Sequence, residues 1–334
     1  MKKVLRVIRK IILGLLAGIG IIVIGLMMNN RIFYAKYCAY DRANDKPVKS
    51  EISEANEILE WLNQNGNQIF DGLDGNIDLI LFNEAYEFLF SDVSYEGWQE
   101  IQTMENGKKI YRRKAQSPQA FATKIGDTWA GSFDTYGYFN CALLEQIPMV
   151  IPPQLLVYDS IGYRSIVVHE MIHAYQGRCD NERVDEAEHL KNIDEPFIQN
   201  MAFNRSIEEE GKILEEALAS KDNEKQLIQS FLNVRDERRK QCGMTEEEIW
   251  REQEFEWLEG GARYGEYIAS QGTKSIVSKN LGNISEKVKT RGDDRFYTLG
   301  MAQILLIKKM QIPNWQSKLL KEGYTPEKIL REAL

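Results

Sequence analysis

The chain has 334 residues, 43% hydrophobic and 28% charged, which is the composition of a folded globular protein and excludes a largely disordered chain. Its net charge is −8. The first ten residues contribute +5 from lysine and arginine, so the remainder carries −13 (−8 minus 5). Because phosphate contacts need clustered Lys and Arg, this acidic remainder excludes nucleic acid as a partner.

Residues 11–28 form an uncharged apolar segment, IILGLLAGIGIIVIGLMM, directly behind the basic run. As a helix they would span about 27 Å, close to the ~30 Å of a bilayer core. We predict a cytoplasmic basic segment over 1–10, a transmembrane signal anchor over 11–28, a juxtamembrane linker over 29–49 and an ectodomain over 50–334. The protein is then a single-pass protein of the cell membrane, with its large domain extracytoplasmic. A cleaved signal peptide is the alternative, but no small-x-small site closely follows the apolar segment.

The first part of the ectodomain combines one helical pattern with several short strand patterns. Apolar spacing predicts a helix over 50–64. Strands are predicted over 76–82, 108–113, 120–125 and 128–139, with a hairpin turn at Glu105-Asn106-Gly107.

The pattern from residue 161 onward is almost entirely helical. The predicted helices cover 161–176, 183–190, 194–219, 222–240, 246–270, 275–289 and 296–310, with a short helix at the C-terminus. We therefore predict an α+β fold, in which a small antiparallel sheet precedes a mostly helical body.

Two histidines four residues apart, His169 and His173, flank Glu170 in the first of these helices. Residues at this spacing share one helix face, so both imidazoles can bind one zinc ion. Glu170 lies beside the metal in such an arrangement and can accept a proton from the water that zinc activates. An amphipathic helix with solvated histidines is the alternative.

The two ends of this helix also carry the expected residue types. Asp159 or Ser160 can cap its N-terminus, and Gly177 is expected to end it in the left-handed conformation.

The string from Ile166 to Tyr175, IVVHEMIHAY, resembles the active-site helix of the zincin metallopeptidases. The resemblance covers this helix directly and, loosely, the order of sheet and helices. It implies cleavage of a peptide or protein substrate with one catalytic Zn²⁺. It also implies that the substrate lies as a strand along the edge of the sheet, for which residues 129–139 are the best candidate.

The third metal ligand is expected from a second helix, because a catalytic zinc usually has three protein ligands. Glu259 in WLEGGARY is the best candidate, since two small residues follow it and permit close packing. This string resembles the E-G-x-A-x-Y element of gluzincin-like families, although the 86 residues from His173 exceed the spacing of thermolysin-like enzymes. Thr245 and Glu248 predict the helix start through a capping box. The alternative ligands are His189, Glu266, Glu256, Glu195 and Asp185.

Catalysis of this kind also needs a donor to the developing oxyanion. Tyr297 and Tyr264 are the candidates that we select, with Arg263 and Tyr267 as alternatives.

The sequence thus predicts a membrane-anchored zinc metallopeptidase with Glu170 as the general base. One alternative is a catalytically silent surface binding protein on a zincin-like scaffold, and another is hydrolysis of a non-peptide substrate. The four cysteines, Cys38, Cys141, Cys179 and Cys242, could form two disulfides or remain free thiols.

Overall fold

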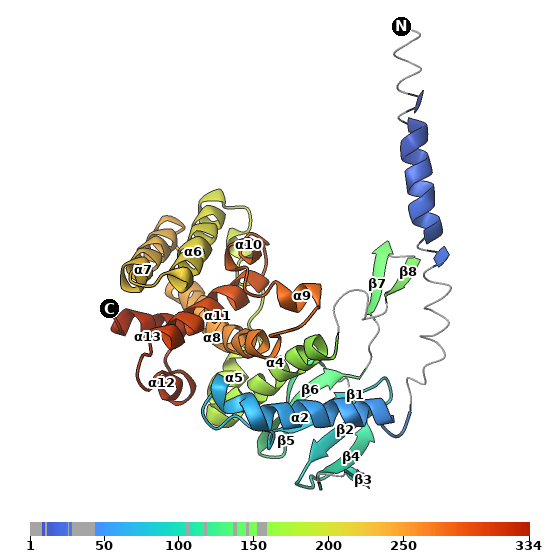
Figure 1. The fold of residues 1–334 in the computed structure, drawn as a ribbon. Helices are drawn as coiled ribbons and strands as arrows, with labels where there is room; N and C mark the ends of the chain where they lie inside the picture. Colours follow the sequence, from blue (N-terminus) through green and yellow to red (C-terminus); the bar gives the residue numbers. More distant parts are fainter. Residues whose placement is uncertain are drawn as a thin grey trace.

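The computed structural model describes residues 9–10, 12–25, 27–28, 44–104, 107–116, 119–135, 139–144, 147–151 and 159–334. These residues form a mixed α and β structure, with most strands in the first half and most helices in the second, as predicted. Helix α4 (Ser160–Cys179) joins the two halves, because it contacts both strand β6 (Thr128–Asp134) and helix α8 (Glu246–Ala269) (Figure 1).

A six-stranded sheet has the strand order β3-β4-β2-β1-β6-β5. Neighbouring strands in this sheet are antiparallel, except for β1 and β6, which pair in parallel. The prediction of a purely antiparallel sheet is therefore wrong. Turn signals specify hairpins between successive strands, whereas the β1–β6 pair joins segments far apart in the sequence. The other strands are β1 (Asp78–Phe82), β2 (Tyr86–Ser91), β3 (Gln99–Thr103), β4 (Lys109–Lys114) and β5 (Phe121–Ile125).

The edge of the sheet beside α4 is β5, not the expected segment 129–139. β6 lies between β1 and β5 and pairs with both, and it ends at Asp134. Within the described part of the chain, the outer backbone groups of β5 have no partner strand. An antiparallel hairpin, β7 (Phe139–Leu144) and β8 (Ile147–Ile151), follows the sheet.

Most of the predicted helices are confirmed, with ends that differ by a few residues, and the capping box of Thr245 and Glu248 is present at the start of α8. The predicted helix over 194–219 divides into a single 3-10 turn and a helix that begins only at Met201. The predicted helix over 275–289 consists of two short helices instead. The remaining helices are α2 (Lys49–Ile69), α5 (Asn181–Ala187), η1 (Glu195–Phe197), α6 (Met201–Ala219), α7 (Glu224–Gln241), α9 (Ile276–Lys279), α10 (Ile284–Lys287), α11 (Asp294–Lys309), α12 (Trp315–Lys321) and α13 (Pro326–Glu332).

The packing of α4 on the sheet depends on glycine. A Cβ on Gly131 would lie 2.7 Å from Cγ of Met171, and a Cβ on Gly177 would lie 2.6 Å from the ring of Trp129. Gly177 therefore does not end the helix, as expected from the sequence, but lies within it and permits close contact with β6. The helix continues to Cys179, and Asp180 follows as its C-terminal cap.

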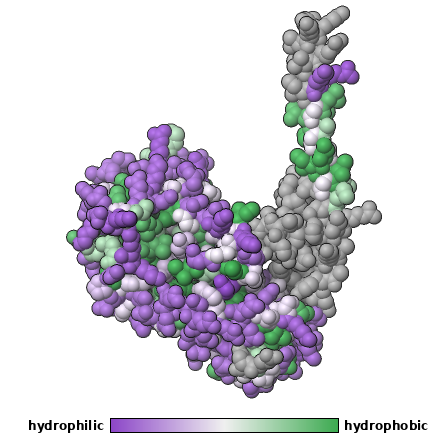
Figure 2. All heavy atoms as spheres, viewed as in Figure 1, coloured by the Kyte–Doolittle hydropathy of each residue, from purple (hydrophilic) through white to green (hydrophobic). Residues whose placement is uncertain are grey.

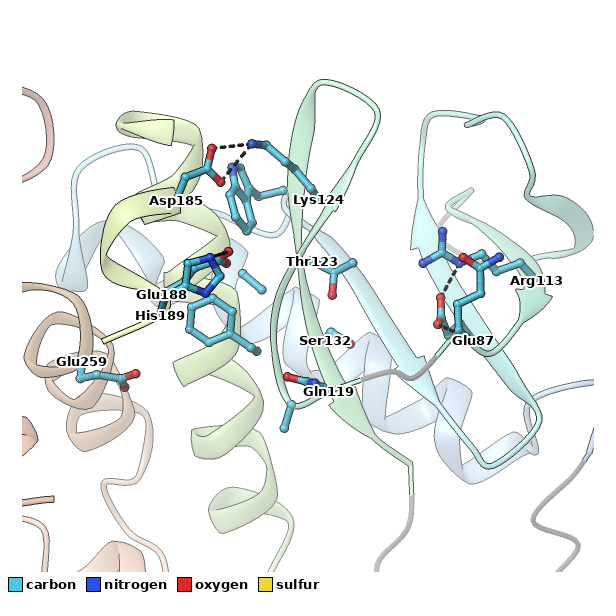
Figure 3. A pocket seen from close by; sticks show the side chains of 15 residues that line it. Glu87, Arg113, Gln119, Thr123, Lys124, Ser132, Asp185, Glu188, His189 and Glu259 are labelled. Atoms are coloured by element: carbon cyan, nitrogen blue, oxygen red, sulfur yellow. Dashed lines mark hydrogen bonds and ion pairs between the residues drawn. The ribbon is translucent and has the colours of Figure 1, made fainter. Parts of the chain in front are cut away.

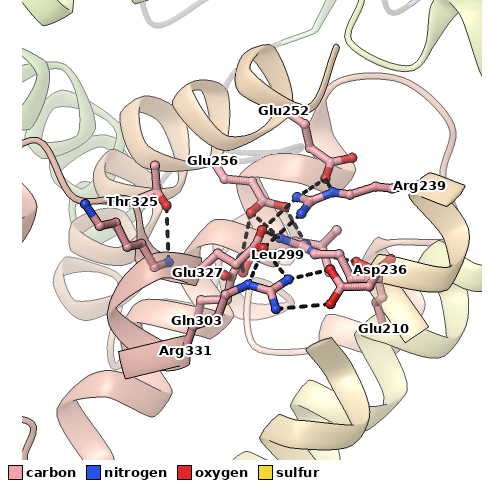
Figure 4. A network of polar contacts seen from close by, with 12 residues as sticks. Glu210, Asp236, Arg239, Glu252, Glu256, Leu299, Gln303, Thr325, Glu327 and Arg331 are labelled. Atoms are coloured by element: carbon pink, nitrogen blue, oxygen red, sulfur yellow. Dashed lines mark hydrogen bonds and ion pairs between the residues drawn. The ribbon is translucent and has the colours of Figure 1, made fainter. Parts of the chain in front are cut away.

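A buried network of ion pairs joins α6, α7, α8 and α13 (Figure 4). Its three buried arginines come from α7, and each pairs with two or three glutamates at 2.6–3.2 Å. Arg331 of α13, which is 38% exposed, also pairs with Glu327 at 2.7 Å. Removing one partner from such a network typically costs about 3–5 kcal/mol, because a buried charge then lacks its counterion. The members are Arg235, Arg238, Arg239, Glu210, Glu252, Glu256 and Glu327.

The N-terminal apolar segment is helical over residues 12–25. The described large apolar side chains between Ile12 and Met28 are 44–71% exposed, and Figure 2 shows hydrophobic atoms on the visible face of this segment. Among the described residues, no helix combines the length and the apolar character needed to cross a membrane. The predicted linker, residues 29–49, lies mostly outside the described residues.

Cys179 and Cys242 are free thiols. Two disulfides would need all four cysteines, so that interpretation is wrong, and the state of Cys38 and Cys141, whose side chains lie outside the described part, remains a prediction.

Candidate metal centre

Asp159 caps the N-terminus of α4, and it is one of the two residues that the sequence predicted for this role. Its carboxylate accepts hydrogen bonds from the backbone nitrogen of Gly162 at 2.8 Å, from the Thr273 hydroxyl at 2.7 Å and from the Lys274 nitrogen at 2.6 Å. Burial would raise the pKa of Asp159, but these hydrogen bonds lower it. The cap therefore ties the start of α4 to the segment that follows α8.

His169, Glu170 and His173 lie in the middle of α4 and are all buried. One potential ligand atom from each lies within 4.8 Å of the others. This buried group could therefore hold a metal ion.

Glu259, from α8, completes the cluster. Its Oε2 lies 3.3 Å from Nε2 of His169 and 3.4 Å from Nε2 of His173. The close approach of the two helices allows this, because a Cβ on Gly261 would lie only 2.8 Å from the Gln176 side chain on α4. The structure thus brings together the three residues that the sequence selected as ligands.

The outer nitrogens of the two imidazoles each face an acceptor. Oε2 of Glu266 lies 3.3 Å from Nδ1 of His169, and Oε1 of Gln176 lies 3.1 Å from Nδ1 of His173. The Gln176 amide is oriented by two hydrogen bonds from its nitrogen, to the carbonyls of Trp257 and Leu258 at 3.1 Å each. We therefore assign a proton to each Nδ1, which leaves a lone pair on each Nε2.

This tautomer assignment makes the centre a site for positive charge. Two imidazole lone pairs and a carboxylate oxygen converge, and they repel one another unless a metal ion or a proton lies between them. Burial would lower the pKa of His169, but Glu259 and Glu266 raise it to about 10. The two imidazoles likewise hold the pKa of the Glu259 carboxyl far below its usual range, against the effect of burial. Two imidazole nitrogens and one carboxylate fit a divalent metal that prefers nitrogen and oxygen ligands.

Glu170 is buried beside this cluster. Burial raises its pKa, although the neighbouring imidazoles of His169 and His173 lower it. A carboxyl group of weakened acidity can both accept and release a proton, as general acid–base chemistry requires.

Tyr297, from α11, also lies at the centre. Its ring stacks with that of His169 at a centroid distance of 6.0 Å. Burial and the Glu259 carboxylate raise the pKa of Tyr297, so its hydroxyl remains a proton donor at neutral pH.

Tyr264 is placed elsewhere, although it was selected with Tyr297. Its hydroxyl accepts a hydrogen bond from Lys308 at 2.9 Å and donates to the Gln68 carbonyl at 3.5 Å, and its ring packs against Phe70. These contacts belong to the packing of α2 and α11 on α8, so we remove Tyr264 from the candidate catalytic set.

The alternative ligands have other partners. The side chain of His189 is 81% exposed and lies 3.4 Å from Glu188. Asp185 pairs with Lys124 at 2.7 Å, and Glu256 pairs with Arg235 at 2.7 Å. Glu195 is exposed in η1, and Glu266 faces the outer nitrogen of His169 rather than the ligand atoms.

A cavity of about 520 Å³ extends from Glu259 along β5 (Figure 3). Its lining includes Phe121, Thr123 and Lys124 from β5 and Glu188 from the segment after α5. The ring centroids of Phe121 and His173 lie 4.5 Å apart, so the start of the edge strand adjoins the candidate metal centre.

Two residues of the centre were not assigned from the sequence. Gln176 was not considered, although it lies three residues after His173 on the same helix and that spacing permits contact. Phe121 was not considered because the edge strand was placed at the wrong segment.

Comparison with known proteins adds nothing to this assignment: no family model, curated protein or solved structure matches the chain.

Proposed function

We propose that this protein is a zinc-dependent peptidase, with His169, His173 and Glu259 as the metal ligands. The observation that carries the proposal is that Nε2 of both histidines lies within 3.4 Å of one carboxylate oxygen of Glu259. Zinc is the metal that best fits two imidazoles and a carboxylate with one position left for water.

A zinc ion held there would polarise a scissile carbonyl and lower the pKa of water toward ~7. Glu170 is then placed to take the proton of the attacking water and to pass it to the departing amine. The Tyr297 hydroxyl is the candidate donor to the oxygen on which negative charge develops.

The substrate in this proposal is an extended peptide. The outer edge of β5 offers backbone N–H and C=O groups that have no partner strand in the described structure, and a peptide can add to such an edge as a further strand. The cavity along β5 begins at Glu259, so a peptide paired there would pass the metal centre.

We also propose that residues 11–28 anchor the protein in the cell membrane, with the large domain extracytoplasmic. The exposed apolar side chains of the N-terminal helix and the basic residues before it support this proposal. Cleavage by a protease added outside intact cells tests it. The domain should be digested, and a domain that resists digestion until the cells are lysed would contradict the topology.

The function is tested by Glu170→Gln in the full-length protein, with zinc content and peptide hydrolysis measured together. We expect zinc to be retained and hydrolysis to be lost, because the substitution removes the proton acceptor but no ligand. Wild-type protein that binds zinc yet cleaves no peptide from a broad library would instead favour the silent binding protein.

A further inference from the structure

Arg263 of α8 lies between two groups of the candidate centre. Its Nε lies 3.2 Å from Oε2 of Glu266, the carboxylate that faces His169. Its guanidinium carbon lies 4.8 Å from the ring centre of Tyr297. One side chain therefore contacts both the partner of a metal ligand and the candidate oxyanion donor.

The guanidinium is itself held in place. Its Nη2 donates to Oδ1 of Asp294 at 2.8 Å, at the start of α11, three residues before Tyr297. The side chain is only 12% exposed, whereas that of Asp294 is 40% exposed. Asp294 thus fixes Arg263 from the outer side without touching the metal ligands.

We infer that Arg263 is a positioning residue that orients Glu266 toward His169 and Tyr297 toward the substrate position. Its Nε lies beside the Glu266 oxygen that accepts a hydrogen bond from Nδ1–H of His169, so Arg263 fixes the position of this carboxylate and, through it, the direction in which Nε2 points. Its guanidinium lies over the Tyr297 ring, which also stacks with the ring of His169. Arg263 was an alternative oxyanion donor from the sequence, but with these contacts it acts through the other two residues.

The inference rests on the proposed metal centre, and the test separates the two. Full-length wild-type, Arg263→Gln, Arg263→Lys and Asp294→Asn proteins are compared with Arg251→Gln. Arg251 is the matched control, because it lies on the same helix and donates a hydrogen bond to the carbonyl of Lys191 at 3.1 Å. The measurements are the zinc dissociation constant by chelator competition, the visible spectrum of the cobalt-loaded protein, kcat at saturating zinc, and the melting temperature.

We expect Arg263→Gln to weaken zinc binding about ten- to hundredfold and to alter the cobalt spectrum. Arg263→Lys should bind zinc more tightly than Arg263→Gln, because its charge still faces Glu266, yet its kcat should stay low, because lysine has no planar group to support Tyr297. Asp294→Asn should show a smaller change in the same direction.

Arg263→Gln with a zinc dissociation constant, spectrum and kcat equal to those of Arg251→Gln would overturn the inference, even if its melting temperature fell. In that case the metal centre would stand and Arg263 would be a packing residue. Wild-type protein that binds no zinc would refute both the proposed function and this inference.

Discussion

Gln176 and His173 lie on the same turn of α4, with Oε1 of the amide 3.1 Å from Nδ1 of the imidazole. The amide nitrogen donates to two carbonyls of α8, so its orientation is determined by the neighbouring helix. The side chain that sets the tautomer of one candidate ligand is therefore also the side chain that joins α4 to the helix carrying Glu259.

Replacement of Gln176 by leucine should affect stability and metal binding together. The two α8 carbonyls lie within the helix, and each would lose the hydrogen bond that the Gln176 amide adds, at a cost of about 0.5–1.5 kcal/mol for each bond. His173 would lose the oxygen that accepts the hydrogen bond from its Nδ1–H, so metal affinity should fall about ten- to hundredfold. Chemical unfolding and metal titration measure the two effects. Gln226→Leu, at an exposed position of α7, is the control, and equal behaviour of the two variants would contradict this assignment.

The crossing of α8 and α11 depends on two glycines in contact. A Cβ on Gly260 would lie 2.5 Å from Cα of Gly300, where only backbone movement could make room. Gly260→Ala should therefore destabilise the protein by about 1–3 kcal/mol or more, and should displace Tyr297 relative to Glu259. The melting temperature and kcat measure these effects. Gly20→Ala is the control: its Cβ would meet nothing within 4 Å, so the melting temperature and kcat should not change. A Gly260→Ala protein with wild-type melting temperature and kcat would show that α8 and α11 do not approach this closely.

The buried ion network predicts a dependence of stability on acid. Burial would raise the pKa of Glu252, but Arg238, Arg239 and Arg235 lower it to about 2, from 4.5 in the unfolded chain. The folded state therefore binds this proton less tightly, so the stabilisation is present above about pH 4.5 and is lost as the pH falls toward 2.

This sign can be checked with Glu252→Gln, from unfolding curves between pH 2 and 7. The variant should be about 3–5 kcal/mol less stable than wild type at neutral pH, because two buried arginines lose a counterion. The difference should shrink as the pH falls below about 4.5. A difference that stays constant down to pH 2 would mean that folding does not lower the pKa of Glu252.

The two tyrosines selected from the sequence should respond differently to loss of the hydroxyl. Tyr297→Phe keeps the ring that stacks on His169, so zinc should remain bound while kcat falls, by about 10²–10³ if the hydroxyl stabilises the oxyanion. Tyr264→Phe should leave kcat near the wild-type value, because its hydroxyl contacts Lys308 and the Gln68 carbonyl. Steady-state kinetics at saturating zinc decide this, and the reverse pattern would exchange their roles.

The sequence predicted those features whose signals are local. The cap at Asp159, the capping box at Thr245 and the spacing of His169 and His173 lie within single helices, and the structure has each of them. Glu259 was identified because the glycines after it indicated close helix packing, which Gly261 makes with the Gln176 side chain.

Features that depend on distant segments were not predicted. The parallel pairing of β1 with β6, and hence the position of β5 at the edge, follows from where the chain crosses the sheet. The charged residues of α7 are typical of a solvated helix, yet Arg235 and Arg238 are fully buried against glutamates from other helices. Tyr264 was wrongly selected as a catalytic candidate for the same reason: the sequence of α8 alone does not show which neighbouring helix each of its faces contacts.

The metal content of the purified full-length protein tests the central claim most directly. Wild-type protein and His189→Ala, which changes an exposed histidine, should each contain about one zinc ion per chain after loading and dialysis. His169→Ala should contain none, and Glu259→Gln should lose most of it. Folded, metal-replete wild-type protein without bound zinc would contradict the account, as would His169→Ala protein that retains the full amount.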